Sequence, residues 1–425
     1  MSNLKKIILV AENISKNMSG EANINLYYLN KFQERNIDCF VVCHGRVKEE
    51  IKQLFPEEEF FSKFYFIEDN WLQILIYKIS KFFPIRIKEM IFGQILFAIT
   101  QLRARTVVKD LIKHENIDLV FQPSPITPKG LNYMYNLAVP VVLGPLSGGL
   151  DFPPAFQYMD SKITKFIIDL SRALSNLLHI IIPGKIQADV LIVSNKKTEK
   201  VLPKGYKGQI YYLFDSGVDL NLWKQKNSKT SIPDGITRFV FMGRFVDWKG
   251  VQFLIEALAL AVEKSNITLD LIGDGELREQ LEKKVKELKL SHRVTFHGWL
   301  STENCLNVLN NSDVFVMPSL REAGGNAVLE AMAIGMPVIV ANWSGLSTIV
   351  SSDCGILVEP DSREDFVNGL AQAIIELSDR RDLRQEMGKA SAQRVRTNYF
   401  DWDSKVDRLV EIFQYTLQTS KKQLS

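Results

Sequence analysis

The stretch from residue 314 to residue 333 reads VFVMPSLREAGGNAVLEAMA. Its first four residues, Val314–Met317, are apolar and favour a buried strand. The loop that follows contains Gly324 and Gly325, which allow a ligand to approach the backbone closely. Apolar spacing then predicts a helix from about Ala327, with Asn326 as its N-cap. Because the first N–H groups of a helix are free and lie at its positive dipole end, we expect these four loop and helix residues to bind phosphate.

Two acidic residues accompany this loop. Glu322 lies within it and Glu330 lies on the first turn of the predicted helix, with seven residues between them. Both carboxylates can therefore face one ligand, and a carboxylate accepts hydrogen bonds from two hydroxyl groups, which suits ribose or a hexose. An acid on the first turn of a helix is also favoured by the helix dipole alone, so a purely structural role for Glu330 stays open.

A second strand, loop and helix start is found at residues 241–250, which read FMGRFVDWKG. Arg244 and Lys249 would lie at the mouth of the sheet, where two cations can bind a diphosphate and stabilise its charge as it leaves. A single cation in a loop is usually only solvated. Two cations at one strand end, opposite a second phosphate site, favour a binding role.

Two further glycine-containing turns follow predicted strands. Residues 271–276 read LIGDGE, in which Gly273 and Gly275 match only the first part of the dinucleotide fingerprint, because Arg278 occupies the third glycine position. Near the N-terminus, residues 18–23 read MSGEAN, and the turn around Gly20 could present backbone N–H groups to a ligand. A plain loop explains this last turn almost as well.

Short β-branched runs alternate with amphipathic stretches in two series. This alternation predicts an α/β protein with two parallel, doubly wound domains. The polar linker at residues 221–234 separates domain 1–222 from domain 223–400, and an amphipathic helix at about 402–418 follows. The predicted strands are 6–11, 38–43, 119–122, 140–144, 190–193, 238–242, 268–272, 293–296, 314–317, 337–340 and 355–358.

Composition limits the class of protein further. The 425 residues are 46% apolar and 24% charged, as in globular proteins, and the formal net charge of +3 gives no indication of nucleic-acid binding. The four cysteines and five histidines lack metal-ligand spacing, so no metal site and only reduced thiols are expected. The first apolar run, residues 7–10, is too short for a signal peptide, and the longest uncharged stretches contain Gly and Pro. We therefore expect a cytoplasmic protein.

Residues 71–109 differ from the rest of the first domain. They combine many aromatic and aliphatic side chains with lysines and arginines and contain few acids. Such a stretch can lie in a membrane interface, which would make the protein peripheral at the inner face of the membrane. Helices packed on the sheet, with their cations extending to solvent, explain the same composition.

Together, these motifs resemble the retaining glycosyltransferases of family 4, which have the two-domain GT-B fold. The resemblance is dense from about residue 240 to residue 360 and thinner before it. It rests on short motifs at these positions: 216–219, 243–244, 249–250, 273–275, 297–298, 322–333, 335–340 and 343–345.

The resemblance implies two Rossmann-like domains facing across a cleft, with the last helix, within 401–425, crossing back to the N-terminal domain. The donor would be a nucleoside-diphosphate sugar in the C-terminal domain, and no cofactor or essential metal would be needed. Arg244, Lys249 and Glu322 would be catalytic, Glu330 would bind the ribose, and the predicted glycine turns would line the donor site. These donor-side turn residues are Gly20, Gly243, Gly273, Gly275, Gly324, Gly325, Asn326 and Ala327. The acceptor would bind the N-terminal domain and would be a glycan or a lipid-linked molecule, as in the assembly of polysaccharides or glycolipids.

One departure from the family pattern concerns a histidine that many members carry near the sugar. Here residues 144–149 read GPLSGG, so backbone N–H groups of Gly148 and Gly149 would have to make that contact. The missing histidine keeps open a non-catalytic nucleotide-sugar-binding protein of the same fold. A nicotinamide-dependent oxidoreductase is not favoured, since no complete dinucleotide fingerprint is present.

Overall fold

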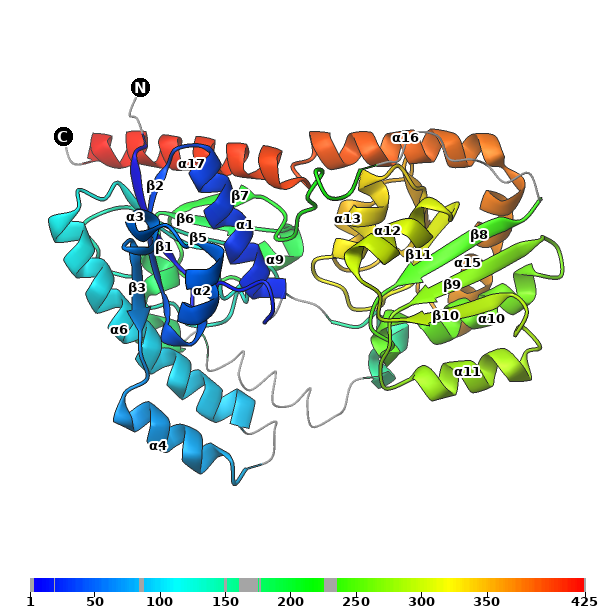
Figure 1. The fold of residues 1–425 in the computed structure, drawn as a ribbon, viewed down its shortest axis with the longest axis horizontal. Coiled ribbons are helices and arrows are strands. Elements are labelled where there is room, and N and C mark those ends of the chain that lie inside the picture. Colours follow the sequence, from blue (N-terminus) through cyan, green and yellow to red (C-terminus); the bar gives the residue numbers. More distant parts are fainter. Residues whose placement is uncertain are drawn as a thin grey trace. The chain divides into compact units, whose positions relative to one another are not determined.

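The computed structural model describes residues 4–18, 20–83, 88–148, 151–159, 175, 177–224 and 235–423 (Figure 1). The chain forms two compact units, the first from Met1–Gly149, Ile167–Asp215 and Trp402–Ser425, the second from Leu150–Phe166 and Ser216–Asp401. The predicted division therefore differs at residues 150–166 and 216–222, which the sequence assigned to the first domain. Phe156 accounts for the first of these differences, because its ring packs against Phe253 and Phe366 of the second unit, with centroids 5.6 and 5.9 Å apart.

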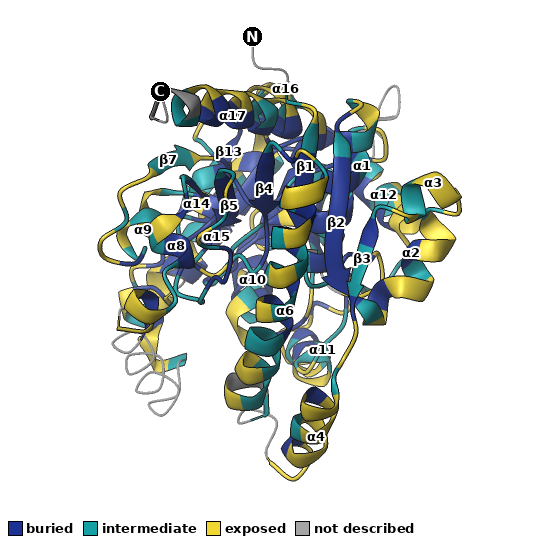
Figure 2. Ribbon diagram, turned by 90° about the vertical axis from the view of Figure 1, so that its left-hand side faces the viewer, coloured by how far each residue is buried: buried dark blue, intermediate teal, exposed yellow. Residues whose placement is uncertain are grey.

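The first unit is built on a seven-stranded parallel sheet in the order β3-β2-β1-β4-β5-β6-β7. Its central strands are almost wholly buried, as expected for parallel strands covered on both faces (Figure 2). The strands are β1 (Lys6–Val10), β2 (Asp38–His44), β3 (Phe64–Ile67), β4 (Leu119–Gln122), β5 (Val141–Leu146), β6 (Val190–Val193) and β7 (Gln209–Tyr212).

Helices cover both faces of this sheet. The helices and helical turns of the first unit are α1 (Gly20–Glu34), η1 (Gly45–Val47), α2 (Lys48–Leu54), α3 (Glu58–Phe61), α4 (Trp71–Ser80), η2 (Lys88–Phe92), α6 (Gly93–His114), α8 (Gly184–Gln187), α9 (Lys196–Lys200) and α17 (Trp402–Gln423). One core cluster joins the sheet to α1 and α17, and the other joins it to α6. None of the helices among the described residues combines the length and the apolar composition that a membrane-spanning segment requires.

The second unit contains a six-stranded parallel sheet in the order β10-β9-β8-β11-β12-β13. Its strands are β8 (Thr237–Met242), β9 (Ile267–Ile272), β10 (Val294–Gly298), β11 (Val314–Met317), β12 (Val338–Ala341) and β13 (Gly355–Val358). Its helices and turns are η3 (Pro154–Met159), η4 (Asp247–Lys249), α10 (Val251–Ala261), α11 (Arg278–Glu287), α12 (Thr302–Asn310), α13 (Asn326–Ala333), α14 (Leu346–Ile349), α15 (Arg363–Asp379) and α16 (Arg381–Thr397).

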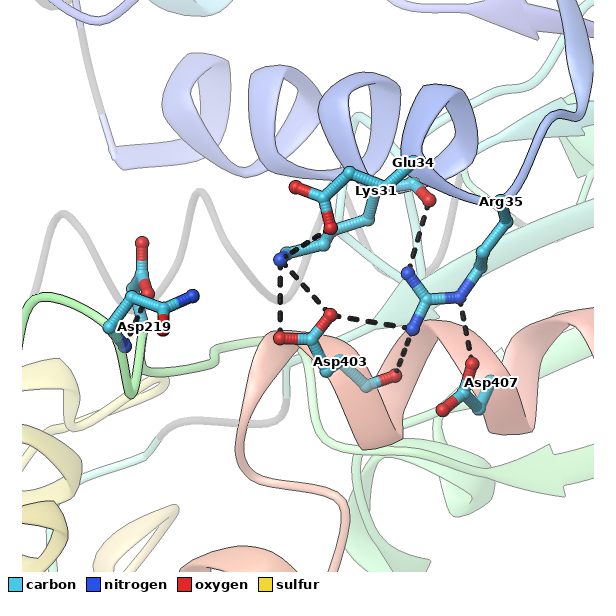
Figure 3. A network of polar contacts seen from close by, with 7 residues as sticks. Lys31, Glu34, Arg35, Asp219, Asp403 and Asp407 are labelled. Atoms are coloured by element: carbon cyan, nitrogen blue, oxygen red, sulfur yellow. Dashed lines mark hydrogen bonds and ion pairs between the residues drawn. The ribbon is translucent and has the colours of Figure 1, made fainter.

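The last helix, α17, packs on α1 of the first unit. Trp402 stacks on Tyr27 with ring centroids 4.8 Å apart, and its edge meets Tyr28 at 5.3 Å. Beside this contact, Lys31 of α1 and Arg35, which directly follows α1, form ion pairs with α17. Each reaches Asp403, at 3.0 and 3.4 Å, and Arg35 also reaches Asp407 at 2.7 Å (Figure 3). The expected return of the C-terminal helix to the first domain is confirmed.

Each sheet has one place where the strand order reverses. The chain winds outward from β1 to β3 on one side and from β4 to β7 on the other, so the reversal lies between β1 and β4. In the second sheet it lies between β8 and β11. Loops that leave the carboxyl ends of such a strand pair diverge and leave room for a ligand. These two strand pairs are therefore the places to look for binding sites.

Candidate functional site

The reversal point of the second sheet brings the loops after β8 and β11 together. The carbonyl of Trp248, in the first loop, accepts hydrogen bonds from the Leu320 N–H at 2.8 Å and from the Ser319 hydroxyl at 3.2 Å, both in the second loop. The two loops that the sequence identified separately as phosphate-binding therefore form one edge of the sheet.

Lys249 and Glu322 form an ion pair across this junction. Their side chains are only 18% and 15% exposed, so the pair is largely shielded from water. The second carboxylate oxygen of Glu322 accepts the N–H of Gly325 at 3.4 Å. The backbone of Glu322 is also held, since its carbonyl accepts the Ser344 hydroxyl at 2.8 Å and the Gly345 N–H at 2.9 Å. The structure thus fixes Lys249 and Glu322 beside the start of α13.

The start of α13 differs by one residue from the sequence prediction. Gly325, not Asn326, is the N-cap, and Asn326 is the first helical residue. Gly325 has a φ of 52°, in the left-handed region that favours glycine. No side chain caps the helix. The N–H groups of Val328 and Leu329 donate to the Gly325 carbonyl. The N–H groups of Asn326 and Ala327, which precede them, have no acceptor among the described residues and can bind solvent or a ligand.

Glu330 lies one turn inside α13 and is half-buried. Burial raises the pKa of its carboxyl group to about 8. In the described part of the chain no cation pairs with it. Burial raises the pKa of the Cys305 thiol on α12, and the negative charge of Glu330 raises it further. A buried carboxyl group that receives no hydrogen bond from the protein can accept hydrogen bonds from the hydroxyl groups of a ligand, and in its protonated form it can also donate one.

Arg244 lies farther out on the same loop as Lys249. Its side chain is 60% exposed, and its guanidinium pairs with Glu276 at 3.1 Å, on the turn after β9. The structure does not bring it into contact with Glu322 among the described residues. Its position at the rim allows the side chain to turn toward a ligand at low cost, because exposed ion pairs contribute little to stability.

Close backbone packing accounts for the glycine pair after β9. A Cβ on Gly273 would lie 2.0 Å from the Gly243 carbonyl oxygen, and one on Gly275 would lie 2.5 Å from the Phe245 carbonyl oxygen. Both distances are too short for any side chain. These glycines therefore let the turns after β8 and β9 lie against each other at the site, a role that the partial dinucleotide pattern did not reveal.

The remaining predicted residues belong to the first unit. Gly20 is the first residue of α1. The N–H of Gly148 donates to the Thr198 hydroxyl at 3.3 Å, so it is already partnered and not free for a sugar. Gly149 lies outside the described residues.

Sequence reasoning missed the segment 151–159, which packs beside the loops after β11 and β12 of its own unit. The Trp343 indole N–H donates to the Asp151 carbonyl at 2.7 Å, and the Arg321 guanidinium lies 5.5 Å from the centre of the Phe152 ring. No local pattern links these residues, because they are about 170 to 190 positions apart in the sequence. They hold the loops after β11 and β12 from outside.

Two Rossmann-like units in one chain, with the last helix returning to the first unit, define the GT-B fold of glycosyltransferases. The structure of the Anabaena protein HepE in complex with UDP and glucose matches 97% of this chain and 100% of its own, with a TM-score of 0.60 at 17% identity. Residues 224–394 match the family model described as glycosyl transferases group 1. The expected fold is thereby confirmed.

Two curated relatives are similar to part of this chain. The lipopolysaccharide core biosynthesis glycosyltransferase LpsD of Rhizobium meliloti is 38% identical over 160 residues, which is 38% of this chain and 44% of the relative. The UDP-Gal:alpha-D-GlcNAc-diphosphoundecaprenol alpha-1,3-galactosyltransferase of Escherichia coli is 29% identical over 210 residues, 47% of this chain and 52% of the relative. The chain thus spans about half the length of these relatives.

Proposed function

We propose that this protein is a retaining glycosyltransferase that moves a sugar from a nucleoside-diphosphate sugar to a glycan or lipid-linked acceptor, in the synthesis of cell-surface polysaccharide or glycolipid. The observation that carries the proposal is the shielded Lys249–Glu322 pair at the glycine-capped start of α13. It combines a cation, a carboxylate and free amides at the reversal point of a parallel sheet, which suits a sugar linked to a diphosphate.

The donor would be bound by three kinds of group. The N–H groups of Asn326 and Ala327 would hold a phosphate, and Lys249 would neutralise the charge that develops as the diphosphate leaves. Arg244 would turn inward from Glu276 to join it. These cations would do what a metal ion does in other transferases, so we propose that no metal is needed.

The two carboxyl groups would bind the sugars of the donor. Glu330 would accept the ribose hydroxyls, and Glu322 would contact the transferred sugar while it orients Lys249. Retention of the anomeric configuration is proposed from the resemblance to family 4. The anomeric proton coupling in the NMR spectrum of the product would test it, since inversion would give the opposite configuration.

The names of the relatives support the acceptor class. One acts in lipopolysaccharide core biosynthesis, and the name of another specifies a diphosphoundecaprenol-linked acceptor. A structure of the same fold was determined with UDP and glucose. We propose by extension that this chain uses a nucleotide sugar and an acceptor of this kind.

The outer surface of the α4, η2 and α6 region supports a peripheral location at the inner membrane face. Residues 71–83 contain two lysines and no acidic residue. Side chains exposed there include Trp71 at 75% and Phe82 at 89%, together with Leu72, Ile74, Leu75, Tyr77, Ile79, Phe83, Ile91 and Ile95 (Figure 2). Exposed aromatic and aliphatic groups flanked by cations match the headgroup region of an anionic bilayer. We propose this region as the membrane-contacting surface.

A thermal-shift panel of UDP-, GDP- and ADP-sugars tests the donor assignment. One of these donors is expected to raise the melting temperature, because a ligand at 100 times its Kd adds about 2.7 kcal/mol to the folded state. The variant Lys249→Ala should lose most of this shift, and its turnover should fall about 100-fold or more, as for removal of a group that stabilises developing charge.

Lys283→Ala provides the matched control, since Lys283 is a 78% exposed lysine on α11 of the same unit. It should keep both the shift and the turnover. A normal rate in Lys249→Ala would reject the proposed role of that residue. Donor binding without transfer to any glycan or lipid acceptor would favour the non-catalytic alternative.

A further inference from the structure

The first unit contains a pocket of about 400 Å³ that the donor-side argument does not use. It lies at the reversal point between β1 and β4, as the second unit's site lies between β8 and β11. Residues that follow β1, β2 and β4 line it, among them Glu12, Asn13, Arg46 and Ser124. Its volume falls in the range of about 300–1,000 Å³ that is usual for small-molecule sites.

The pocket is rich in hydrogen-bond acceptors. Glu12 and Glu21 line it, and burial raises the pKa of both carboxyl groups. The amide oxygens of Asn13 and Asn25 are buried without a hydrogen-bond partner in the structure. Buried acceptors that lack a donor cost free energy, and in native proteins they usually have a ligand or water as partner.

Two donor groups of the pocket are already used within it. The Asn25 amide nitrogen, on a residue only 1% exposed, donates to the Asn13 carbonyl at 2.8 Å and to the Ser124 hydroxyl at 3.0 Å, which fixes its oxygen as the free atom. Arg46 donates to Glu12 at 3.2 Å. One oxygen of Glu21 accepts the Ile126 N–H at 2.9 Å, and its other oxygen remains for a ligand. A ligand that bonds to these free oxygens must therefore bring donors of its own.

From this pattern, we infer that the pocket binds the hydroxyl groups of an uncharged sugar ring, the head group of the acceptor, and rejects phosphate or carboxylate groups. The inference rests on the proposed function and specifies its acceptor. Two carboxylates against one arginine repel an anion, whereas sugar hydroxyls supply the missing donors. Leu96, Phe97 and Leu131 also line the pocket and offer apolar contact to a sugar face or to an attached chain.

Direct binding to the full-length protein, without any nucleotide sugar, tests the inference. The probes are octyl glucoside, octyl phosphate and octylamine, which share one chain and differ in head group, each below its micelle concentration in a calorimetric titration. Octyl glucoside is expected to bind most tightly. Tightest binding of octyl phosphate or of octylamine would overturn the inference, and this comparison requires no variant.

The variant Glu21→Gln connects this binding to the pocket. It keeps the oxygen that accepts the Ile126 N–H and replaces the free carboxylate oxygen with an amide donor. Affinity for octyl glucoside should fall about tenfold, as for the loss of a hydrogen bond to a charged group. Glu12→Gln serves as a second pocket variant, and the exposed Glu263→Gln in the second unit serves as the control.

Unchanged octyl glucoside affinity in both pocket variants would overturn the inference. The thermal shift by nucleotide sugars reports separately on the second unit. If octyl glucoside does not bind at the pocket while nucleotide sugars still raise the melting temperature, only the acceptor class is rejected. If octyl glucoside binds there but no nucleotide sugar raises the melting temperature, only the donor assignment is rejected.

Discussion

At the residue scale, the ion pair between Lys249 and Glu322 ties the loop after β8 to the loop after β11. Lys249 and Glu322 were both predicted for the site, yet their 73-residue separation hid the ion pair that joins them. The helix cap was assigned to Asn326 because amide side chains are favoured there. The structure instead has Gly325 at the cap, because the backbone turns through a left-handed conformation before the helix. Side-chain preference predicted the helix start to within one residue, and backbone geometry decided the cap.

The carboxyl group of Glu330 provides a pH-dependent test at this scale. Burial raises its pKa in the folded protein from 4.5 to about 8. Between these values the folded chain binds the proton more strongly than the unfolded chain, so this contribution to stability is present at low pH and is lost as the pH rises through about 8. The melting temperature of Glu330→Gln, measured by differential scanning calorimetry, should therefore equal that of the wild type at a pH of about 5 and exceed it at a pH of about 8.5. Equal differences in melting temperature at the two pH values would contradict the assigned burial.

At the element scale, the sequence predicted several strands well. Residues 119–122, 190–193, 314–317 and 355–358 were predicted with the observed bounds, because each is mostly apolar. The sequence missed β3 and β7, the two outer strands of the first sheet. Both are four-residue strands with two or more partly exposed positions, so their pattern is weak. The first-unit pocket escaped prediction for a different reason, since its residues come from separate loops.

The contact between α17 and α1 offers a comparison of packing with ion pairing. Trp402 is 2% exposed, and its indole nitrogen has no hydrogen-bond partner, so its contribution is packing. Asp407 pairs with Arg35 but is 65% exposed. Trp402→Ala should lower the free energy of unfolding of the first unit by about 3–5 kcal/mol, and Asp407→Ala by about 0–1 kcal/mol. Urea denaturation followed by circular dichroism would measure both, and equal losses would show that the ion pairs dominate.

At the scale of the whole molecule, the class of protein followed from motifs concentrated in one half of the chain. Those motifs lie in the second unit, where the proposed function requires the backbone to approach phosphate groups closely, and few residue types satisfy that requirement. The first unit has no such constraint on its loops. Its acceptor side could therefore be predicted only through the resemblance, and the N–H of Gly148 proved to be partnered by Thr198.

The proposed membrane contact also belongs to this scale. Wild-type protein is expected to sediment with vesicles that contain anionic lipid and less with purely zwitterionic ones. The double variant Trp71→Ser/Phe82→Ser should reduce the bound fraction about tenfold or more, because it removes two large apolar groups. Leu260→Ser, at a 44% exposed position on α10 of the second unit, is the control. Undiminished sedimentation of the double variant would exclude this surface.

The return of α17 to the first unit affects the order in which the chain can mature on the ribosome. The core beside α1 includes Val406, Leu409 and Phe413, which are translated after every residue of the second unit. The second unit has all its segments once Asp401 is made, although most of it is encoded later than the first. The first unit, which as the N-terminal domain would usually fold first, therefore lacks part of its core until the whole second unit has been translated. The unit translated first stays open along one face until the final helix emerges.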